Sequence, residues 1–173
     1  MLKKSIPNVL TYTNLSFGVL SILEMIKENY IASAVFIMFA ALVDRYDGRL
    51  ARHFDVCSEF GRELDSLADL VSFGIAPALL IFYKFNFLDL GNIKMMGSCF
   101  LLLYIICGSS RLAKYNISKF DGVFMGIPIT VAGLILALYS LAAPSNTISA
   151  HISMIILILL AYFMVSKFEF KKI

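Results

Sequence analysis

The sequence predicts an all-α integral membrane protein in which six transmembrane helices form one bundle. Of the 173 residues, 60% are hydrophobic and only 16% are charged, whereas soluble domains are nearer half apolar and a quarter charged. The apolar residues form six long runs, and a helix needs about 20 residues to cross a hydrocarbon core of about 30 Å. Six such spans with short joins use the whole chain, so we expect residues 1–173 to form a single membrane domain.

The six predicted spans follow one another closely. Charged and turn-forming residues separate them, as in KFNFLDLGNIK between the third and fourth spans and APSNT between the fifth and sixth. The first residues, MLKKSIPN, are either a short amphipathic lead-in lying on the membrane surface or an ordinary basic flank, and the sequence does not decide between them. The predicted spans are 7–26, 31–52, 64–85, 95–112, 124–143 and 148–165.

The basic residues give this bundle an orientation. Twelve of the fifteen lysines and arginines lie before the first span, at the join of the second and third, at the join of the fourth and fifth, or after the sixth. Only Lys27, Lys84 and Lys94 fall on the opposite side. The positive-inside rule therefore predicts that both termini and residues 44–69 face the cytoplasm from the cell membrane. With a net charge of +3 and scattered basic residues, the chain lacks a nucleic-acid footprint.

Residues 44–69 carry seven carboxylates between two apolar runs. Asp44 and Asp47 are three residues apart, and Asp65 and Asp69 are four apart, so each pair lies on one face of a helix. The linker 53–60 is long enough to reverse the chain, which allows the two pairs to face each other. Four converging carboxylates repel one another unless a hard divalent cation neutralises them. We therefore expect Mg²⁺ or Mn²⁺, two ions per site.

A second interpretation of the acidic stretch needs no metal. The aspartates can instead pair with nearby arginines or lie solvated beyond the bilayer, and this is what we expect of Asp55, Glu59 and Glu63. The arginines concerned are Arg45, Arg49, Arg52 and Arg62.

Small residues between the aspartates favour a nucleotide diphosphate as the ligand. Gly48 and Ala51 leave the surface of the first acidic helix nearly bare, so that a flat base can approach the backbone. Arg52, one turn beyond Gly48, can hold a phosphate. Gly61 relieves crowding where the second acidic helix begins.

These residues carry a resemblance to a known family. The pattern Asp44-x-x-Asp47-Gly48-x-x-Ala51-Arg52, eight residues, Gly61-x-x-x-Asp65-x-x-x-Asp69 resembles the signature of the CDP-alcohol phosphatidyltransferases at every fixed position. The resemblance implies that the aspartates bind two divalent metals, that the glycines, alanine and arginine receive the CDP group, and that Asp69 is the base. It also implies a six-helix core that is usually a homodimer. Arg45 departs from the family pattern, because a small or apolar residue is more usual there.

The acceptor is suggested by other segments. IPNVLTYTNLSFGVLSI, LDSLADLVSFGIAPA, SSRLAKYN and GIPIT are similar to the membrane-bound phosphatidylserine synthases of this family. The resemblance implies transfer of a phosphatidyl group from CDP-diacylglycerol, or CDP-archaeol, to L-serine with release of CMP. Family members with phosphorylated acceptors usually carry Lys or Arg soon after the last aspartate, and Leu70–Phe73 has neither. Glycerol phosphate or inositol phosphate remains the alternative acceptor.

Several further residues are candidates for substrate contacts. Asn8 and Thr11 match positions that help hold the CDP group in relatives. Arg111 is either the partner of the serine carboxylate or a basic anchor at the membrane surface. Ser72 and Asn116 are weaker candidates for the serine pocket.

Two unrelated functions fit part of the pattern. An intramembrane prenyltransferase also uses aspartates and metals to hold a diphosphate, but it needs more helices than 173 residues supply. An ion carrier would place acids within helices, yet it has no need of Gly48, Ala51 and Arg52 at fixed offsets.

Overall fold

The computed structural model is built almost entirely from helices, and it describes residues 2–53, 58–89, 94–117, 124–166 and 169–170. In chain order the elements are α1 (Leu2–Ile26), α2 (Tyr30–His53), α3 (Glu59–Asp69), the π-helical segment η1 (Leu70–Ile75), α4 (Ala76–Lys84), the short 3₁₀ turn η2 (Phe87–Asp89), α5 (Lys94–Ile117), β1 (Phe124–Met125), α6 (Ile129–Ala142), α7 (Thr147–Val165) and β2 (Glu169–Phe170).

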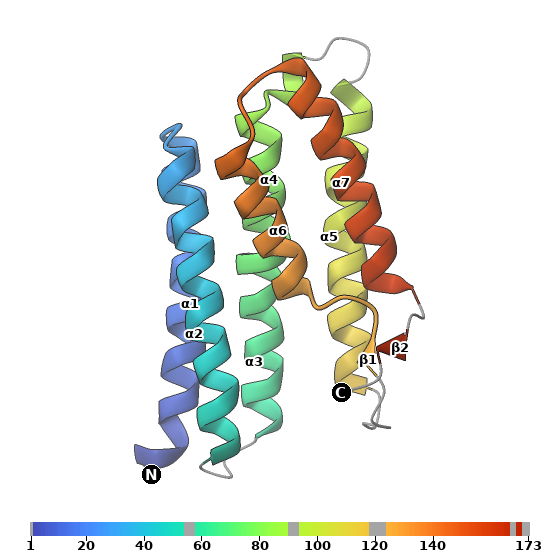
Figure 1. Ribbon diagram of the computed structural model, residues 1–173. Coiled ribbons are helices and arrows are strands. Elements are labelled where there is room, and N and C mark those ends of the chain that lie inside the picture. The colour runs from blue at the N-terminus through green and yellow to red at the C-terminus, as the bar shows by residue number, and fades with distance from the viewer. Residues whose placement is uncertain (1, 54–57, 90–93, 118–123, 167–168, 171–173) are drawn as a thin grey trace.

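The helices form one upright bundle (Figure 1). α1 packs against α2, while α3, η1 and α4 follow one another as a single column in the middle. α5 packs against α7, and α6 contacts both α2 and α4. The start of α1, the end of α2, the start of α3 and the β1–β2 strand pair lie at the same end of the bundle (Figure 1). This placement agrees with the predicted even number of passes.

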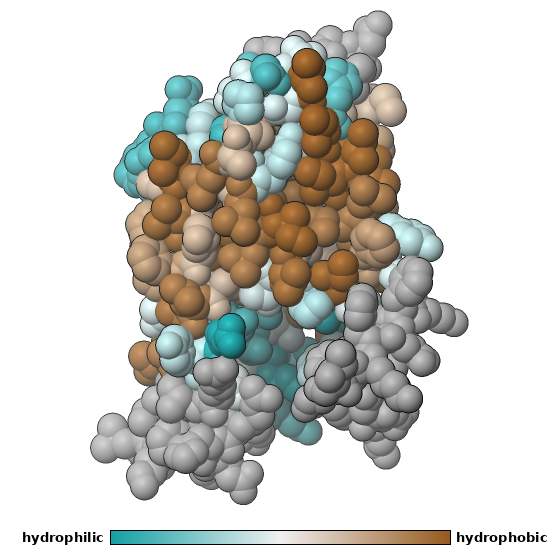
Figure 2. All heavy atoms as spheres, in the orientation of Figure 1, coloured by the Kyte–Doolittle hydropathy of each residue, from teal (hydrophilic) through white to brown (hydrophobic). Residues whose placement is uncertain are grey.

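The surface is that of a membrane protein. Figure 2 shows a broad hydrophobic band across the middle of the visible face, with hydrophilic residues above and below it. Within the described residues, four helical stretches are long and apolar enough to cross a bilayer: Asn8–Ile26, Glu59–Lys84, Met95–Ile117 and Thr147–Val165. α6 is apolar but shorter, and the last turns of α2 carry the charged residues of the acidic motif.

The first predicted span begins earlier than expected, because residues 2–7 belong to α1 and form no separate helix in front of it. The third and fourth spans are also longer than predicted: α3 begins at Glu59 and α5 ends at Ile117. Both extensions contain polar residues. A prediction from hydropathy ends a span at such residues, but a helix can continue past the hydrocarbon core into water.

The predicted start of the fifth span is wrong. Residues 124–125 form β1, which pairs antiparallel with β2, and α6 begins only at Ile129 after Pro128. Gly126 has φ +71°, and a Cβ there would lie 2.6 Å from the carbonyl oxygen of Met164. The chain therefore crosses the end of α7 in an extended form, held by a hydrogen bond from the Ile127 amide to the Phe163 carbonyl. Apolarity alone could not distinguish this crossing from the helix that follows it.

A π-helical segment directly after Asp69 was not predicted. Pro77 has no amide hydrogen and cannot donate to the carbonyl of Phe73 four residues earlier. The buried hydroxyl of Tyr104 on α5 donates to that carbonyl instead, at 2.9 Å. The neighbouring backbone hydrogen bonds span five residues instead of four. The amide of Ala76, for example, donates to the carbonyl of Val71. Such π segments are frequent at functional sites.

Two glycines let neighbouring helices close on this segment from either side. A Cβ on Gly18 of α1 would lie 2.4 Å from the Ser72 hydroxyl oxygen, and a Cβ on Gly133 of α6 would lie 2.9 Å from the Phe73 Cα. Phe73 and Tyr104 are fully buried. The core therefore surrounds η1, and it holds the helix end that carries Asp69 in a defined position.

Candidate active site

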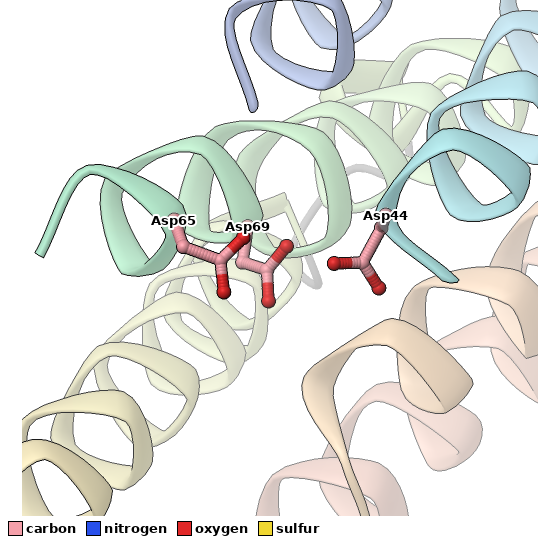
Figure 3. A group of neighbouring side chains, drawn as sticks. All are labelled: Asp44, Asp65 and Asp69. Carbon is pink, nitrogen blue, oxygen red and sulfur yellow. The ribbon is translucent and has the colours of Figure 1, made fainter. Parts of the chain in front are cut away.

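Three of the four predicted aspartates come together in space. Asp44, Asp65 and Asp69 each offer a carboxylate oxygen, and these oxygens lie within 4.8 Å of one another. Asp65 and Asp69 leave the same side of α3 and point toward Asp44, which comes from α2 (Figure 3). The predicted hairpin is confirmed: α2 ends at His53 and α3 begins at Glu59. Ser58 caps α3 by accepting a hydrogen bond from the Gly61 amide at 3.0 Å.

Asp47 lies outside this group of three. Its carboxylate accepts a hydrogen bond from the hydroxyl of Thr11 on α1, and the side chain is buried. Its charge nevertheless acts on both Asp44 and Asp65. Thr11, predicted as a contact to the CDP group, thus holds an aspartate in place.

Asn14 is a site residue that was not predicted. Its side-chain amide donates to Oδ1 of Asp69 at 3.2 Å. One turn earlier, Thr11 reaches Asp47, so a single face of α1 supports an aspartate from each half of the motif. The sequence does carry a signal for this, since Asn8, Thr11 and Asn14 recur every third residue and so share one face of the predicted first span.

A second unpredicted neighbour comes from α6. The side chain of Thr130 approaches Asp44 as a hydrogen-bond partner. Thr130 lies in the first turn of α6, directly after the chain crosses the end of α7. The extended segment 124–128 therefore determines where this hydroxyl meets the acidic cluster.

Neither Arg45 nor Arg62 neutralises the carboxylates of the cluster. Among the described side chains, none of the four aspartates forms an ion pair with Arg45 or Arg62, and both arginines are exposed. The side chains of Arg49 and Arg52 lie outside the described residues. Two unit charges 4.8 Å apart repel by about 3 kcal/mol at an effective dielectric constant of about 20. The cluster is thus a strongly negative site that attracts a cation.

The donor set fits Mg²⁺ or Mn²⁺. All its ligand atoms are carboxylate oxygens, which hard divalent cations prefer. Thr11 and Asn14 each donate to an aspartate oxygen, as neighbours of metal ligands commonly do.

The residues predicted to bind CDP come from α1, α2 and α3. Asn8 and Gly61 are adjacent, since a Cβ on Gly61 would lie 3.4 Å from Oδ1 of Asn8. Gly48 is exposed on α2, one turn beyond Asp44. Ala51 and Arg52 belong to the last turn of α2, but their side chains lie outside the described residues.

The residues predicted to bind serine have different surroundings. Arg111 on α5 is half-buried, and its charge acts on Asp69. Ser72 is fully buried and donates to the backbone carbonyl of Asn14 at 3.0 Å. Asn116 donates to the hydroxyl of Ser66 at 2.9 Å and to the carboxylate of Glu63 at 3.2 Å. Ser72 and Asn116 therefore join helices, whereas Arg111 faces the cluster.

Comparison with known proteins identifies the family of this chain. The family model for CDP-alcohol phosphatidyltransferase matches residues 4–166. The chain belongs to this family. It is 36% identical over 166 residues to a CDP-diacylglycerol–serine O-phosphatidyltransferase of Bacillus subtilis, a match that covers 95% of this chain and 89% of the relative.

Two further relatives come from other lineages. The chain is 32% identical to an archaetidylserine synthase of Methanothermobacter thermautotrophicus, over 98% of this chain and 70% of the relative. It is 33% identical to a CDP-diacylglycerol–serine O-phosphatidyltransferase of Helicobacter pylori, over 76% of this chain and 55% of that longer protein. As a CDP-alcohol phosphatidyltransferase, the chain is a transferase of phospholipid biosynthesis, and its acidic cluster lies where the family signature predicts it.

Proposed function

We propose that this phosphatidyltransferase moves a phosphatidyl group from CDP-diacylglycerol to the hydroxyl of L-serine, producing phosphatidylserine and CMP. In an archaeal membrane the donor would be CDP-archaeol. The observation that carries the proposal is the cluster of Asp44, Asp65 and Asp69 in a chain whose relatives from bacteria and an archaeon are named as synthases of serine lipids.

Four aspartates would hold the divalent cations. Asp44, Asp65 and Asp69 form the cluster, and Asp47 would add a fourth carboxylate from the adjacent turn of α2. When bound, two Mg²⁺ or Mn²⁺ ions supply positive charge beside the diphosphate, which stabilises the charge that develops on the departing CMP and on the attacked phosphorus. Because Thr11 and Asn14 already hold Asp47 and Asp69, little reorientation is needed when substrate arrives.

The CDP head would lie along the C-terminal turns of α2. Gly48 and Ala51 are three residues apart on that helix and, as small residues, would leave room for the nucleotide, while Arg52 would receive a phosphate. Asn8 and Gly61, which are adjacent, would bound the same space from α1 and α3. The acyl chains would remain in the bilayer beside the helices.

Asp69 would act as the general base. As the serine oxygen forms its bond to the phosphorus of the phosphatidyl group, the bond from that phosphorus to the CMP oxygen breaks and CMP leaves with the electron pair. The hydroxyl proton passes to Asp69. A serine hydroxyl is a poor nucleophile at neutral pH, so a positioned carboxylate is needed to accept this proton.

The choice of serine over a phosphorylated acceptor follows from what lies beyond Asp69. Leu70–Ile75 has no cation, and Ser72, Phe73 and Gly74 are buried. Arg111 is therefore the candidate partner for the carboxylate of serine. Glycerol phosphate and inositol phosphate, each carrying a phosphate, are the alternative acceptors within the same chemistry.

The membrane arrangement is part of the proposal. Six helical passes would bring both termini and the acidic site to the cytoplasmic side of the cell membrane, where CDP-linked donors and serine are available. As in the family generally, the active form would be a homodimer.

The test is a transfer assay with a panel of alcohols. Purified protein is incubated with CDP-diacylglycerol, Mn²⁺ and either serine, glycerol 3-phosphate or inositol phosphate, and CMP and lipid products are measured. We expect transfer to serine alone. Comparable turnover of glycerol 3-phosphate would move the chain to another branch of the family, and transfer to none of the three alcohols would refute serine as the acceptor.

A further inference from the structure

Two buried polar atoms beside Asp69 have no hydrogen-bond partner among the described residues. They are Oδ1 of Asn14 and Nε of Arg111. Burying such an atom without a partner is unfavourable, and native proteins rarely leave one unpaired. The two atoms are of opposite kinds, because an amide oxygen accepts a hydrogen bond and a guanidinium nitrogen donates one. A ligand that satisfies both must carry a donor and an acceptor.

The orientation of the Asn14 amide follows from its neighbour. An ionised carboxylate can only accept hydrogen bonds, so the amide nitrogen must face Asp69, and it lies 3.2 Å from Oδ1 of that residue. The amide oxygen is then turned away from Asp69 but belongs to the same small planar group. Asn14 is 0% exposed, so this oxygen gains a partner only when the side chains around it move to admit one.

The backbone holds Asn14 in place. Its carbonyl accepts a hydrogen bond from Ser72, and Gly18, one turn later, allows α1 to approach Ser72 closely. The side chain therefore has little freedom to turn elsewhere for a partner. Its neighbour one turn earlier, Thr11, is engaged with Asp47.

Arg111 supplies the complementary group. It approaches Asp69 from α5, and its charge acts on that carboxylate, but no described residue forms an ion pair with it. An unsatisfied acceptor on α1 therefore belongs to the side chain that contacts Asp69, and an unsatisfied donor on α5 belongs to the arginine whose charge acts on Asp69.

We infer that Asn14 determines the specificity for an amino-acid acceptor by accepting a hydrogen bond from its ammonium group through Oδ1. The inference rests on the proposed transfer to serine. In serine the hydroxyl and the ammonium are on neighbouring carbons, so a molecule whose hydroxyl reaches Asp69 presents its ammonium to the group next to Asp69. That group is Asn14. The carboxylate, on the same carbon as the ammonium, is left for Arg111.

The experiment compares acceptors that differ from serine by one group. 3-Hydroxypropanoate lacks the ammonium and ethanolamine lacks the carboxylate. Each is measured as an acceptor by kcat/KM, or as a competitor of serine where transfer to it is too slow. The variants are Asn14→Leu, Arg111→Leu and Asn14→Asp. Tyr139→Phe is the control, since the Tyr139 hydroxyl bonds the Ser149 carbonyl far from the cluster.

We expect Asn14→Leu to lower the preference for serine over 3-hydroxypropanoate by about 10–100-fold, the usual value of a hydrogen bond to a charged group. Loss of the bond to Asp69 slows both acceptors and cancels in this ratio. The preference over ethanolamine should fall in Arg111→Leu and survive in Asn14→Leu. Asn14→Asp keeps an acceptor oxygen and should keep the preference for the ammonium, which provides a test even if the leucine variant does not fold.

Two results would overturn the inference. The first is that Asn14→Leu keeps the wild-type preference for serine over 3-hydroxypropanoate. The second is that Asn14→Asp or the control Tyr139→Phe loses this preference too. A wild-type protein that transfers nothing to serine would instead refute the proposed function, so the two failures are distinguishable.

Discussion

The substitution Asp44→Asn should change the thermal stability of this protein in opposite directions with and without divalent cations. Asp44 takes part in two of the three close carboxylate pairs of the cluster, in which the oxygens lie within 4.8 Å. Removing its charge relieves about 3 kcal/mol of repulsion from each neighbouring carboxylate that is ionised in metal-free protein. Because side chains rotate apart to reduce repulsion, we expect at least about 1 kcal/mol to appear, or about 2–4 °C in Tm for a protein of this size.

With a cation bound, Asp44→Asn should lower the Tm instead of raising it. A cation present at 100 times its Kd stabilises the wild type by about 2.7 kcal/mol, which raises Tm by about 5–10 °C. Asp44→Asn removes one ligand and should lose most of this gain. In EDTA the variant should therefore melt above the wild type, and in Mn²⁺ below it.

The assay is thermal unfolding in detergent at pH 8, with EDTA or with a Mn²⁺ titration. Glu59→Gln is the matched control, because it removes a negative charge from the exposed first turn of α3 without touching the cluster. The reasoning is refuted if wild-type Tm does not respond to Mn²⁺, or if Asp44→Asn lowers Tm equally in both buffers.

Three further predictions concern the base, the nucleotide and the packing around η1. Asp69→Asn should reduce kcat by about 10²–10⁴-fold with donor binding largely retained; metal content is measured in parallel, and turnover within a few-fold of wild type at full metal occupancy would exclude Asp69 as the base. Gly48→Leu should strongly weaken binding of CDP-diacylglycerol, whereas Ala142→Leu, at an exposed position at the end of α6, should not; normal donor binding by the first variant would place the nucleotide elsewhere. Gly133→Ala should lower Tm, since its Cβ would lie 2.9 Å from the Phe73 Cα and overpacking costs about 1–3 kcal/mol; a raised Tm would mean that helix propensity outweighs this contact.

Residue order alone was enough to predict most of the long helices and the meeting of Asp44, Asp65 and Asp69. Long apolar runs require helices in a bilayer, because every backbone polar group must be satisfied within its own segment. The spacing of Asp44 and Asp47, and of Asp65 and Asp69, places each pair on one helix face, and the short linker makes the two faces meet. These are local rules, and they act over distances that the sequence displays directly.

Other features depended on contacts between distant segments. The sequence does not show that Pro77 leaves the Phe73 carbonyl free, since the hydroxyl that satisfies it comes from Tyr104 on another helix. Nor does it show that residues 124–125 pair with β2. Apolar residues directly before a helix have the same hydropathy as the helix, so the sequence predicts one continuous span. In both cases the local backbone conformation depends on a residue that is distant in sequence.

The hydrogen-bond partner of each polar residue was likewise determined by the tertiary structure. The family resemblance implied that Asn8 and Thr11 contact the CDP group, and Ser72 and Asn116 were candidates for the serine pocket. In the structure Thr11 holds Asp47, and Ser72 and Asn116 join helices, so their contacts to substrates stay predictions. Asn14 received no role from the sequence, although it is the residue hydrogen-bonded to Asp69. The amino-acid order determined which chemical groups the site can contain. Only the packing of α1 against α3 and η1 decided which of them meet, because a hydrogen bond depends on position to within a fraction of an ångström.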